Sequence, residues 1–228
     1  MPGNPAISPT RAAKLKAKKY RETERLFLAE GTAILEEAPT EPLHVFDEAE
    51  QIRRVSTLKT PTGPVGVFPF LDVTVAELLS LAQRVVLLHG VQDPGNVGTV
   101  IRSAHAFGAG IALSKGSADL YNPKTVRATM GSIFHARVAR EIESVAFLDA
   151  ARDAGFVSVA AVPGVGETPR HLPAGRLVVC IGAEGSGLPF EVVGACQRRV
   201  GIPSLAPSLN AAVAASILLY EAYLRMLL

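Results

Sequence analysis

The stretch HGVQDPGNVGTVIRSAHAFGAG, residues 89–110, decides the fold of this 228-residue chain. It follows the apolar run at 85–88, which predicts a buried strand, and it contains a helix expected over residues 97–107 that stops at Gly108. A second apolar run at 110–114 follows at once. Strand, helix and strand in this order predict two parallel strands joined by a crossover helix.

The same alternation continues through the rest of the chain. Further strands are predicted at residues 136–140, 156–161, 177–181 and 198–202. Further helices are predicted at residues 143–154, 188–196 and 208–227, and another starts at Asn122-Pro123, where asparagine suits the N-cap and proline the first helical position. The pattern predicts an α/β fold in which helices cover both faces of a parallel sheet.

The N-terminal third of the chain follows a different pattern. A helix is predicted over residues 11–29, ending near Gly31, and then a strand at 42–47, a helix at 48–55 and a strand at 63–70. We expect a small α+β domain at residues 1–75 and a larger α/β domain at residues 82–228.

The composition indicates a globular protein without a membrane segment. Hydrophobic residues make up 48% of the chain and charged residues 19%, which is typical of a packed core and not of disorder. The start MPGNPAISPT carries no apolar leader, and no run approaches the roughly 18 apolar residues that a membrane span needs. We therefore expect a cytoplasmic protein.

The cysteines and histidines predict no metal site. Cys180 and Cys196 do not have the spacing of metal ligands, nor do the five histidines. Cys180 lies in an apolar run and is expected to be a small core residue.

The charge is concentrated near the start of the chain. Between Arg11 and Arg25 there are seven basic residues and two acids, a net charge of +5, whereas the whole chain carries only +2. This basic arm predicts a polyanionic partner, most simply nucleic acid, although an ordinary solvated helix face has the same composition. The candidate RNA-binding residues are Arg11, Lys14, Lys16, Lys18, Lys19 and Arg21.

Two familiar phosphate-binding loops do not fit residues 89–110. A P-loop needs a lysine and a serine or threonine after its second glycine, whereas NVGT follows Gly95. A dinucleotide-binding loop needs three spaced glycines and an acid about 20 residues later, where this chain has Lys115 and Gly116. Nucleotide hydrolysis is therefore not expected.

Three polar loops nevertheless follow predicted strands directly. DPGNVGTVIR follows the strand at 85–88, GAEGSGLP follows the strand at 177–181, and PSLAPSLN follows the strand at 198–202. Ligands of open α/β sheets bind beyond the carboxyl ends of the strands, so these loops are expected to form one site.

The same three segments resemble a known family. DPGNVGTVIRSAHAFGA, LVVCIGAEGSGLP and IPSLAPSLNAAVAASILLYE are similar, in order and spacing, to the three motifs of the SpoU (TrmH-like) RNA 2′-O-ribose methyltransferases of the SPOUT class. The resemblance covers residues 83–228, and RAAKLKAKKYRETERLFLAEG more weakly resembles the substrate-binding domain of many members. It implies transfer of a methyl group from S-adenosyl-L-methionine (AdoMet) to structured RNA, with rRNA favoured over tRNA.

The resemblance assigns roles to individual residues. It implies a catalytic site of Arg102, Asn96, Glu184, Ser208 and Asn210. Arg102 would stabilise the alkoxide that develops when the 2′-hydroxyl loses its proton. The alternatives for Arg102 are a surface salt bridge or a plain phosphate contact. The alternative is a helix cap for Glu184 and the N-cap of the last helix for Ser208. The implied cofactor contacts, largely backbone, are Gly182, Ile202, Leu209, Ala161 and Gly185.

The family's fold adds three expectations. It implies a deep trefoil knot over residues 157–228, a homodimer that covers the apolar last helix, and an abbreviated L30e-like N-terminal domain. Two alternatives remain open on the residues alone. One is a non-catalytic RNA-binding or ribosome-assembly factor with the same fold, and the other is a small-molecule α/β enzyme, which would leave the basic arm unexplained.

Overall fold

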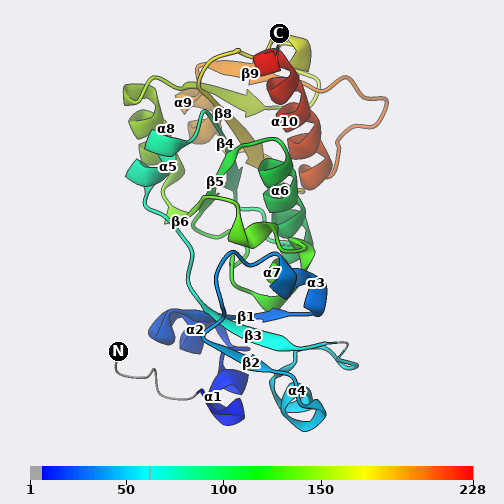
Figure 1. The fold of residues 1–228 in the computed structure, drawn as a ribbon. Coiled ribbons are helices and arrows are strands. Elements are labelled where there is room, and N and C mark those ends of the chain that lie inside the picture. The colour runs from blue at the N-terminus through cyan, green and yellow to red at the C-terminus, as the bar shows by residue number, and fades with distance from the viewer. Residues whose placement is uncertain (1–6, 62, 228) are drawn as a thin grey trace.

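The C-terminal part of the chain is built on a parallel sheet of six strands. The computed structural model describes residues 7–61 and 63–227, and the strand order is β6-β5-β4-β8-β7-β9 with every pairing parallel (Figure 1). The strands are β4 (Arg84–His89), β5 (Gly110–Ser114), β6 (Val138–Ile142), β7 (Val157–Ala161), β8 (Leu177–Gly182) and β9 (Arg198–Val200). All six predicted strands form, and β6 lies two residues later than expected. The predicted parallel α/β fold is therefore confirmed.

Helices cover both faces of this sheet because its strands are apolar on both sides. In β4, Val86 and Leu88 face one hydrophobic cluster while Val85 and Leu87 face another, as the period of two of a strand requires. The first cluster is covered by α6 (Pro94–Ala106), α7 (Pro123–Ala128) and α10 (Ala211–Leu227). The second is covered by α5 (Val75–Leu81), α8 (Ser144–Asp153) and α9 (Phe190–Ala195). Two short 3₁₀ helices, η1 (Ser132–Phe134) and η2 (Pro169–His171), lie in the connections.

The N-terminal residues form a separate antiparallel sheet. Its order is β1-β3-β2, from β1 (Leu26–Glu30), β3 (Val65–Pro69) and β2 (His44–Phe46). The helices around it are α1 (Pro9–Lys14), α2 (Lys18–Glu24), α3 (Thr32–Glu36) and α4 (Ala49–Val55). Residues 1–6 lie outside the described part of the chain. The expectation that the chain starts without an apolar leader falls mostly on these residues, so the structure does not test it.

The single helix predicted over residues 11–29 is wrong. The chain forms α1 and α2 and then leaves the helical conformation at Arg25, whose φ is 55°, before β1 begins at Leu26. The run LFLAE is buried at every position, because β1 pairs with β3 while its side chains pack on both faces. Continuous burial suits a strand better than an amphipathic helix, and the tertiary pairing overrides the helical pattern of the residues before it.

The two sheets share a core and are joined by two ion pairs, of which Arg21–Asp119 is buried. The ring centroids of Phe27 in β1 and Tyr121, before α7, lie 4.9 Å apart. Arg21 pairs with Asp119 at 2.5 Å. Arg140 pairs with Glu22 at 2.7 Å. These contacts fix α2 and β1 against the parallel sheet. Within the described residues, no helix is long and apolar enough to cross a membrane.

Candidate functional site

A cavity opens at the carboxyl ends of β7, β8 and β9. Its volume is about 840 Å³, and its walls come from the segments after these strands, residues 161–168, 181–187 and 200–211. The five residues predicted to contact a cofactor, Gly182, Ile202, Leu209, Ala161 and Gly185, all line it. Ser208 lines it as well. The structure thus brings the second and third polar loops together as expected, and their contact with a cofactor stays a prediction.

Gly182 allows the wall after β8 to turn tightly. A Cβ atom on Gly182 would lie 2.1 Å from the backbone carbon of Gly187, so no other residue fits there without moving the loop. The Gly187 amide donates to the Ala183 carbonyl at 2.9 Å, and Gly187 has a φ of 65°. This turn presents Glu184 at the edge of the cavity.

Three side chains from distant parts of the sequence form a hydrogen-bonded chain beside the cavity. The Asn210 amide Nδ2 donates to Asn96 Oδ1 at 3.0 Å, and Asn96 Nδ2 donates to the Glu184 carboxylate. Asn96 lies in the first turn of α6, where its backbone amide donates to Asp93 at 2.9 Å. That hydrogen bond lowers the pKa of the Asp93 carboxyl. The first polar loop therefore joins the other two through Asn96.

The last helix begins later than predicted, and this changes the role of Ser208. Asn210 Oδ1 accepts hydrogen bonds from the backbone amides of Ala212, at 2.9 Å, and Val213, at 3.2 Å. Asn210 therefore caps α10, and the alternative in which Ser208 caps it is wrong. The cap alternative for Glu184 is also wrong, because Pro189 precedes α9 without a side-chain cap.

Arg102 lies on α6 with its side chain exposed to solvent. It follows Asn96 by six residues, so it stands about 9 Å further along the helix axis. Among the residues that the structure describes, no ion pair or side-chain hydrogen bond engages its guanidinium group, in contrast to the predicted alternative of a surface salt bridge. Arg102 is free to meet a ligand.

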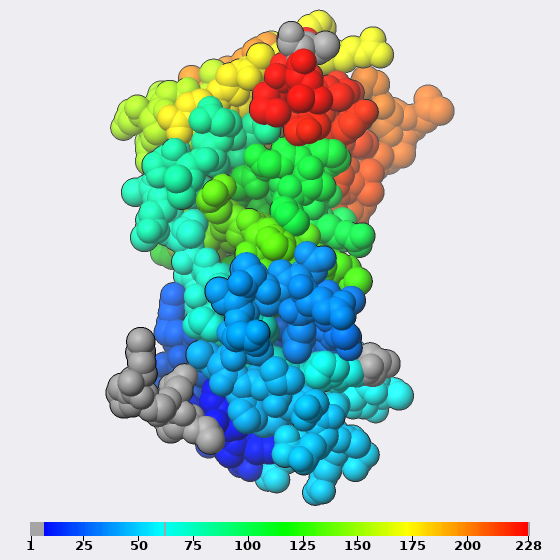
Figure 2. All heavy atoms as spheres, viewed as in Figure 1, coloured from blue at the N-terminus to red at the C-terminus, as the bar shows by residue number. Residues whose placement is uncertain are grey.

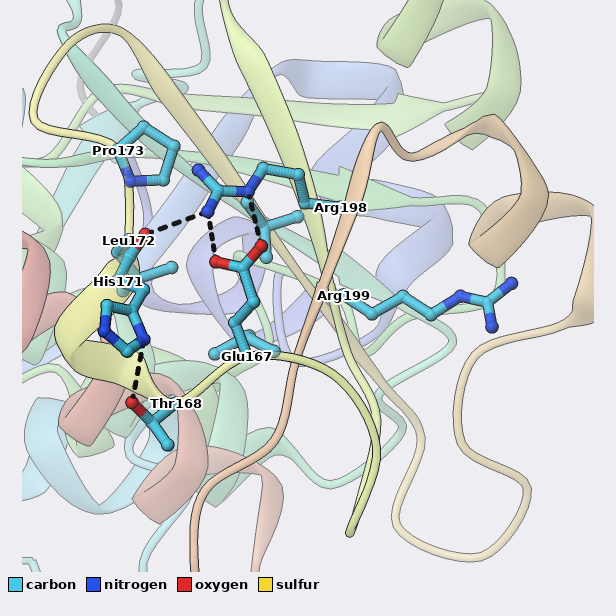
Figure 3. Close-up of a pocket in the computed structure, with 9 residues that line it drawn as sticks. Glu167, Thr168, His171, Leu172, Pro173, Arg198 and Arg199 are labelled. Atoms are coloured by element: carbon cyan, nitrogen blue, oxygen red, sulfur yellow. Dashed lines mark hydrogen bonds and ion pairs between the residues drawn. The ribbon is translucent and has the colours of Figure 1, made fainter.

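An ion pair braces the cavity wall that lies after β7. Figure 3 shows Arg198 facing the carboxylate of Glu167 and the backbone of His171, while Arg199 points away. Arg198 Nε donates to Glu167 at 3.1 Å. The Glu167 amide donates to the Arg199 carbonyl at 3.0 Å, and the Gly201 amide donates to the Glu167 carbonyl at 2.9 Å. The hollow drawn there has no room for a ligand, and its residues hold the adjacent segment 163–168 against β9.

The basic arm is only partly available for a partner. Arg21 is 3% exposed and donates to the carbonyls of Leu15 and Lys16 as well as pairing with Asp119, so its prediction as an RNA contact is wrong. Arg11 pairs with Glu24 at 2.7 Å, and Lys18 pairs with Glu141 at 3.1 Å. The side chains of Lys14, Lys16 and Lys19 are exposed.

Packing of α4 beside α1 enlarges this basic surface. Lys16 Nζ donates to the carbonyl of Arg54 at 2.9 Å, which places exposed Arg53 and Arg54 next to the arm. Lys14 Nζ lies 5.6 Å from the ring centroid of Tyr20, a half-exposed aromatic side chain. The sequence contains the Arg53-Arg54 pair, but its distance from the arm gives no signal that α1 and α4 pack together. This surface lies at the end of the molecule opposite the loop after β9 (Figure 2).

The known proteins that the chain resembles are RNA methyltransferases. The profile of the SpoU rRNA Methylase family matches residues 83–220. The chain is 31% identical over 234 residues to the 23S rRNA (guanosine(2553)-2′-O)-methyltransferase RlmP of Bacillus subtilis, and the match covers 91% of this chain and 92% of RlmP.

Solved structures agree over nearly the whole chain. An AdoMet-bound rRNA methyltransferase from Sinorhizobium meliloti superposes with a TM-score of 0.85 at 28% identity and covers 99% of this chain and 97% of its own. The SpoU methyltransferase AviRb from Streptomyces viridochromogenes, in complex with AdoMet, gives a TM-score of 0.80 at 25% identity, with 96% and 97% covered.

Proposed function

The chain belongs to the SpoU rRNA Methylase family, and on that premise we propose that it transfers a methyl group from AdoMet to a ribose 2′-hydroxyl of rRNA. The observation that carries the proposal is the hydrogen-bonded chain Asn210–Asn96–Glu184 at the edge of the cavity. It gathers polar residues of all three family motifs into one place. The protein's relative RlmP is named for 2′-O-methylation of 23S rRNA, and this favours rRNA over tRNA as the substrate.

The cavity suits AdoMet in size and in chemistry. Its volume of about 840 Å³ lies in the range of small-molecule sites. The wall at residues 182–187 contains three glycines, and Ile202 and Leu209 add apolar residues to the wall at 200–211. We assign the cofactor contacts to Gly182, Gly185, Ile202, Leu209 and Ala161. When bound, AdoMet supplies a methyl carbon that its sulfonium group activates toward attack.

We assign to Arg102 the role of assisting loss of the 2′-hydroxyl proton. Its guanidinium group is exposed on the helix that carries Asn96, and an unpaired cation stabilises the negative charge that develops on the attacking oxygen. Glu184 and Asn210 orient the amide of Asn96, which leaves that side chain preorganised to hold the ribose. Ser208 lines the cavity and would help to orient the substrate.

We assign RNA recognition to residues 1–75 and methyl transfer to residues 82–228. The exposed cations at the remote end, Lys14, Lys16, Lys19, Arg53 and Arg54, suit RNA phosphates, and Tyr20 offers a ring for stacking. Arg11 and Lys18 share their charge with acids and contribute less. The antiparallel sheet β1-β3-β2 with its short helices would be the abbreviated L30e-like module.

Two family features of the larger domain also belong to the proposal. Membership of the SpoU family supports a trefoil knot within residues 157–228. Exposed apolar side chains on α10, Val213, Tyr220, Met226 and Leu227, support a homodimer in which a second subunit covers them. An rRNA substrate implies a cytoplasmic protein.

The test is to incubate the protein with methyl-labelled AdoMet and a mixture of unmodified rRNA and tRNA, and then to separate the two RNA classes and measure the label in each. We expect label in rRNA at ribose 2′-oxygens, and loss of that label in Arg102→Ala. Arg137→Ala is a matched control, because Arg137 is exposed and precedes β6, at the opposite end of the strands from the cavity. No label together with no AdoMet binding would refute the proposal in favour of a non-catalytic RNA-binding factor.

A further inference from the structure

The two cysteines of the chain lie side by side in the structure. Cys180, in β8, is fully buried, and Cys196, which ends α9, is half-buried. Their Sγ atoms are 3.5 Å apart, although 16 positions separate them in the sequence. Gln197, which follows Cys196, is hydrogen-bonded to β7: its amide donates to the Ser158 carbonyl at 3.1 Å, and its Oε1 accepts from the Ser158 amide at 2.7 Å.

In the sequence, Cys180 and Cys196 flank the segment that forms the cavity wall carrying Glu184. Residues 181–195 contain the end of β8, the turn at 183–187 and all of α9. Cys180 precedes Gly182 by two residues on a strand that is paired on both sides, with β4 and β7. A link between the two sulfur atoms would therefore connect both ends of the segment that positions Glu184.

The two thiols differ in reactivity. The hydrogen bond between the sulfur atoms lowers the pKa of Cys196, and the Ser158 hydroxyl adds to this. The same hydrogen bond, together with burial, raises the pKa of Cys180 well above its ordinary value. Cys196 is therefore the thiol that ionises first and reaches solvent, and a thiolate is the nucleophile in cysteine oxidation.

We propose that Cys196 is a site of oxidation by peroxide, that oxidation ends in a Cys180–Cys196 disulfide, and that this bond lowers the affinity for AdoMet. The Cys196 thiolate attacks one peroxide oxygen, the O–O bond breaks, and a sulfenic acid and water form. The Cys180 sulfur then attacks the sulfenic sulfur, the S–O bond breaks, the S–S bond forms and a second water leaves. Two thiols lose two electrons, hydrogen peroxide gains them, and a dithiol reverses the reaction.

The effect on the cavity follows from the distance that must close. A disulfide requires about 2.05 Å between sulfur atoms, against 3.5 Å in the reduced protein. Because β8 is fixed between two strands, the approach falls to Cys196 at the end of α9, and a shift of α9 carries the turn before it. This displaces Glu184 and the wall around Gly185. The loss of AdoMet affinity rests on the proposed function, whereas the disulfide does not.

The experiment uses the full-length protein, reduced or treated with hydrogen peroxide and then alkylated. No lysine or arginine lies between Arg176 and Arg198, so trypsin leaves both cysteines in one peptide, whereas cleavage at Glu184 and Glu191 separates them. We expect a disulfide-linked pair of peptides in the oxidised sample. We also expect AdoMet affinity, measured by isothermal titration calorimetry, to fall at least threefold and to recover with dithiothreitol.

Two variants make the result specific. Cys196→Ser and, separately, Cys180→Ala should bind AdoMet like the reduced protein and lose the response to peroxide. A peroxide-treated protein with both thiols still free, or a disulfide that leaves AdoMet affinity unchanged, would overturn the proposal. AdoMet binding and methyl transfer by the reduced protein test the proposed function separately, so its failure is recognised before any peroxide is added.

Discussion

Asn210 donates a hydrogen bond to Asn96 at 3.0 Å, across a separation of 114 positions in the sequence. The same Asn210 caps α10 through its side-chain oxygen, and Asn96 lies in the first turn of α6. Two helix starts thus meet at the cavity through one pair of amide side chains. The cap of α10 fixes Asn210, and Asn210 and Glu184 together orient the Asn96 amide, so this part of the site is preorganised.

Arg102→Ala is expected to lower methyl transfer by about 10²–10³-fold, the range for removing one group that stabilises a developing oxyanion. AdoMet affinity should stay within a few-fold, because Arg102 is exposed on α6 and does not line the cavity. Single-turnover rates with labelled AdoMet and titration calorimetry give the two quantities. Retained turnover in Arg102→Ala, with Arg137→Ala unchanged, would remove Arg102 from the mechanism.

Glu184→Ala is expected to lower kcat about tenfold or more, since a hydrogen bond to a charged group contributes about 1.5–3 kcal/mol. The loss arises because the amide of Asn96 is no longer oriented by the carboxylate. Glu184→Gln keeps an acceptor oxygen and should recover part of kcat, while KM for the RNA changes little in both variants. Equal kcat values for the alanine and glutamine variants would contradict a positioning role.

Gly182→Ala is expected to abolish AdoMet binding, because its Cβ atom would lie 2.1 Å from the Gly187 backbone. The turn after β8 would have to open, and the cavity wall would move with it. Gly175→Ala is the matched control, since a Cβ there meets nothing within 4 Å. Calorimetry and thermal melting of both variants check this, and normal AdoMet affinity in Gly182→Ala would show that the wall adapts.

Joint replacement of Lys16, Arg53 and Arg54 by glutamine is expected to weaken RNA binding and to reduce its salt dependence. Each lost phosphate contact should lower the slope of log K against log salt concentration by about one. Fluorescence anisotropy of a labelled rRNA fragment at several salt concentrations measures this slope. A slope equal to that of the unchanged protein would mean that this surface does not contact RNA.

Arg21→Ala is expected to act on stability and not on RNA binding. The change leaves Asp119 without its partner in a buried site, which costs about 3–5 kcal/mol in similar cases. Denaturant unfolding should show this loss, whereas Lys19→Ala, an exposed change on the same helix, should leave the free energy of unfolding within about 0.5 kcal/mol. An RNA affinity that falls while stability is unchanged would contradict the buried role.

The parallel sheet could be predicted from the sequence because its strands are continuous apolar runs separated by helical segments with clear ends. Gly108 and the pair Asn122-Pro123 mark helix boundaries by their backbone conformations. Residues 26–30 could not be predicted in this way. Four apolar residues after a basic helix extend its pattern, and only pairing with β3 makes them a strand.

The residues of the site could be predicted from the sequence, but the hydrogen bonds between them could not. The resemblance named Asn96, Glu184 and Asn210, but no local pattern tells that Asn210 caps α10 while also holding Asn96. In the basic arm, Arg21 and Lys19 look alike in the sequence. Only the docking of α2 against the loop that carries Asp119 makes one of them structural.

The core shared by Phe27 and Tyr121 has a consequence for the proposed recognition of RNA. Because this packing and the Arg21–Asp119 pair hold the two sheets together, the spacing between the basic end and the cavity is a built-in length. On the proposed function, this fixed spacing would select an RNA partly by its dimensions and not only by its bases. A change at the junction that tilts one sheet against the other would move the methyl group to a different nucleotide before it stopped the reaction.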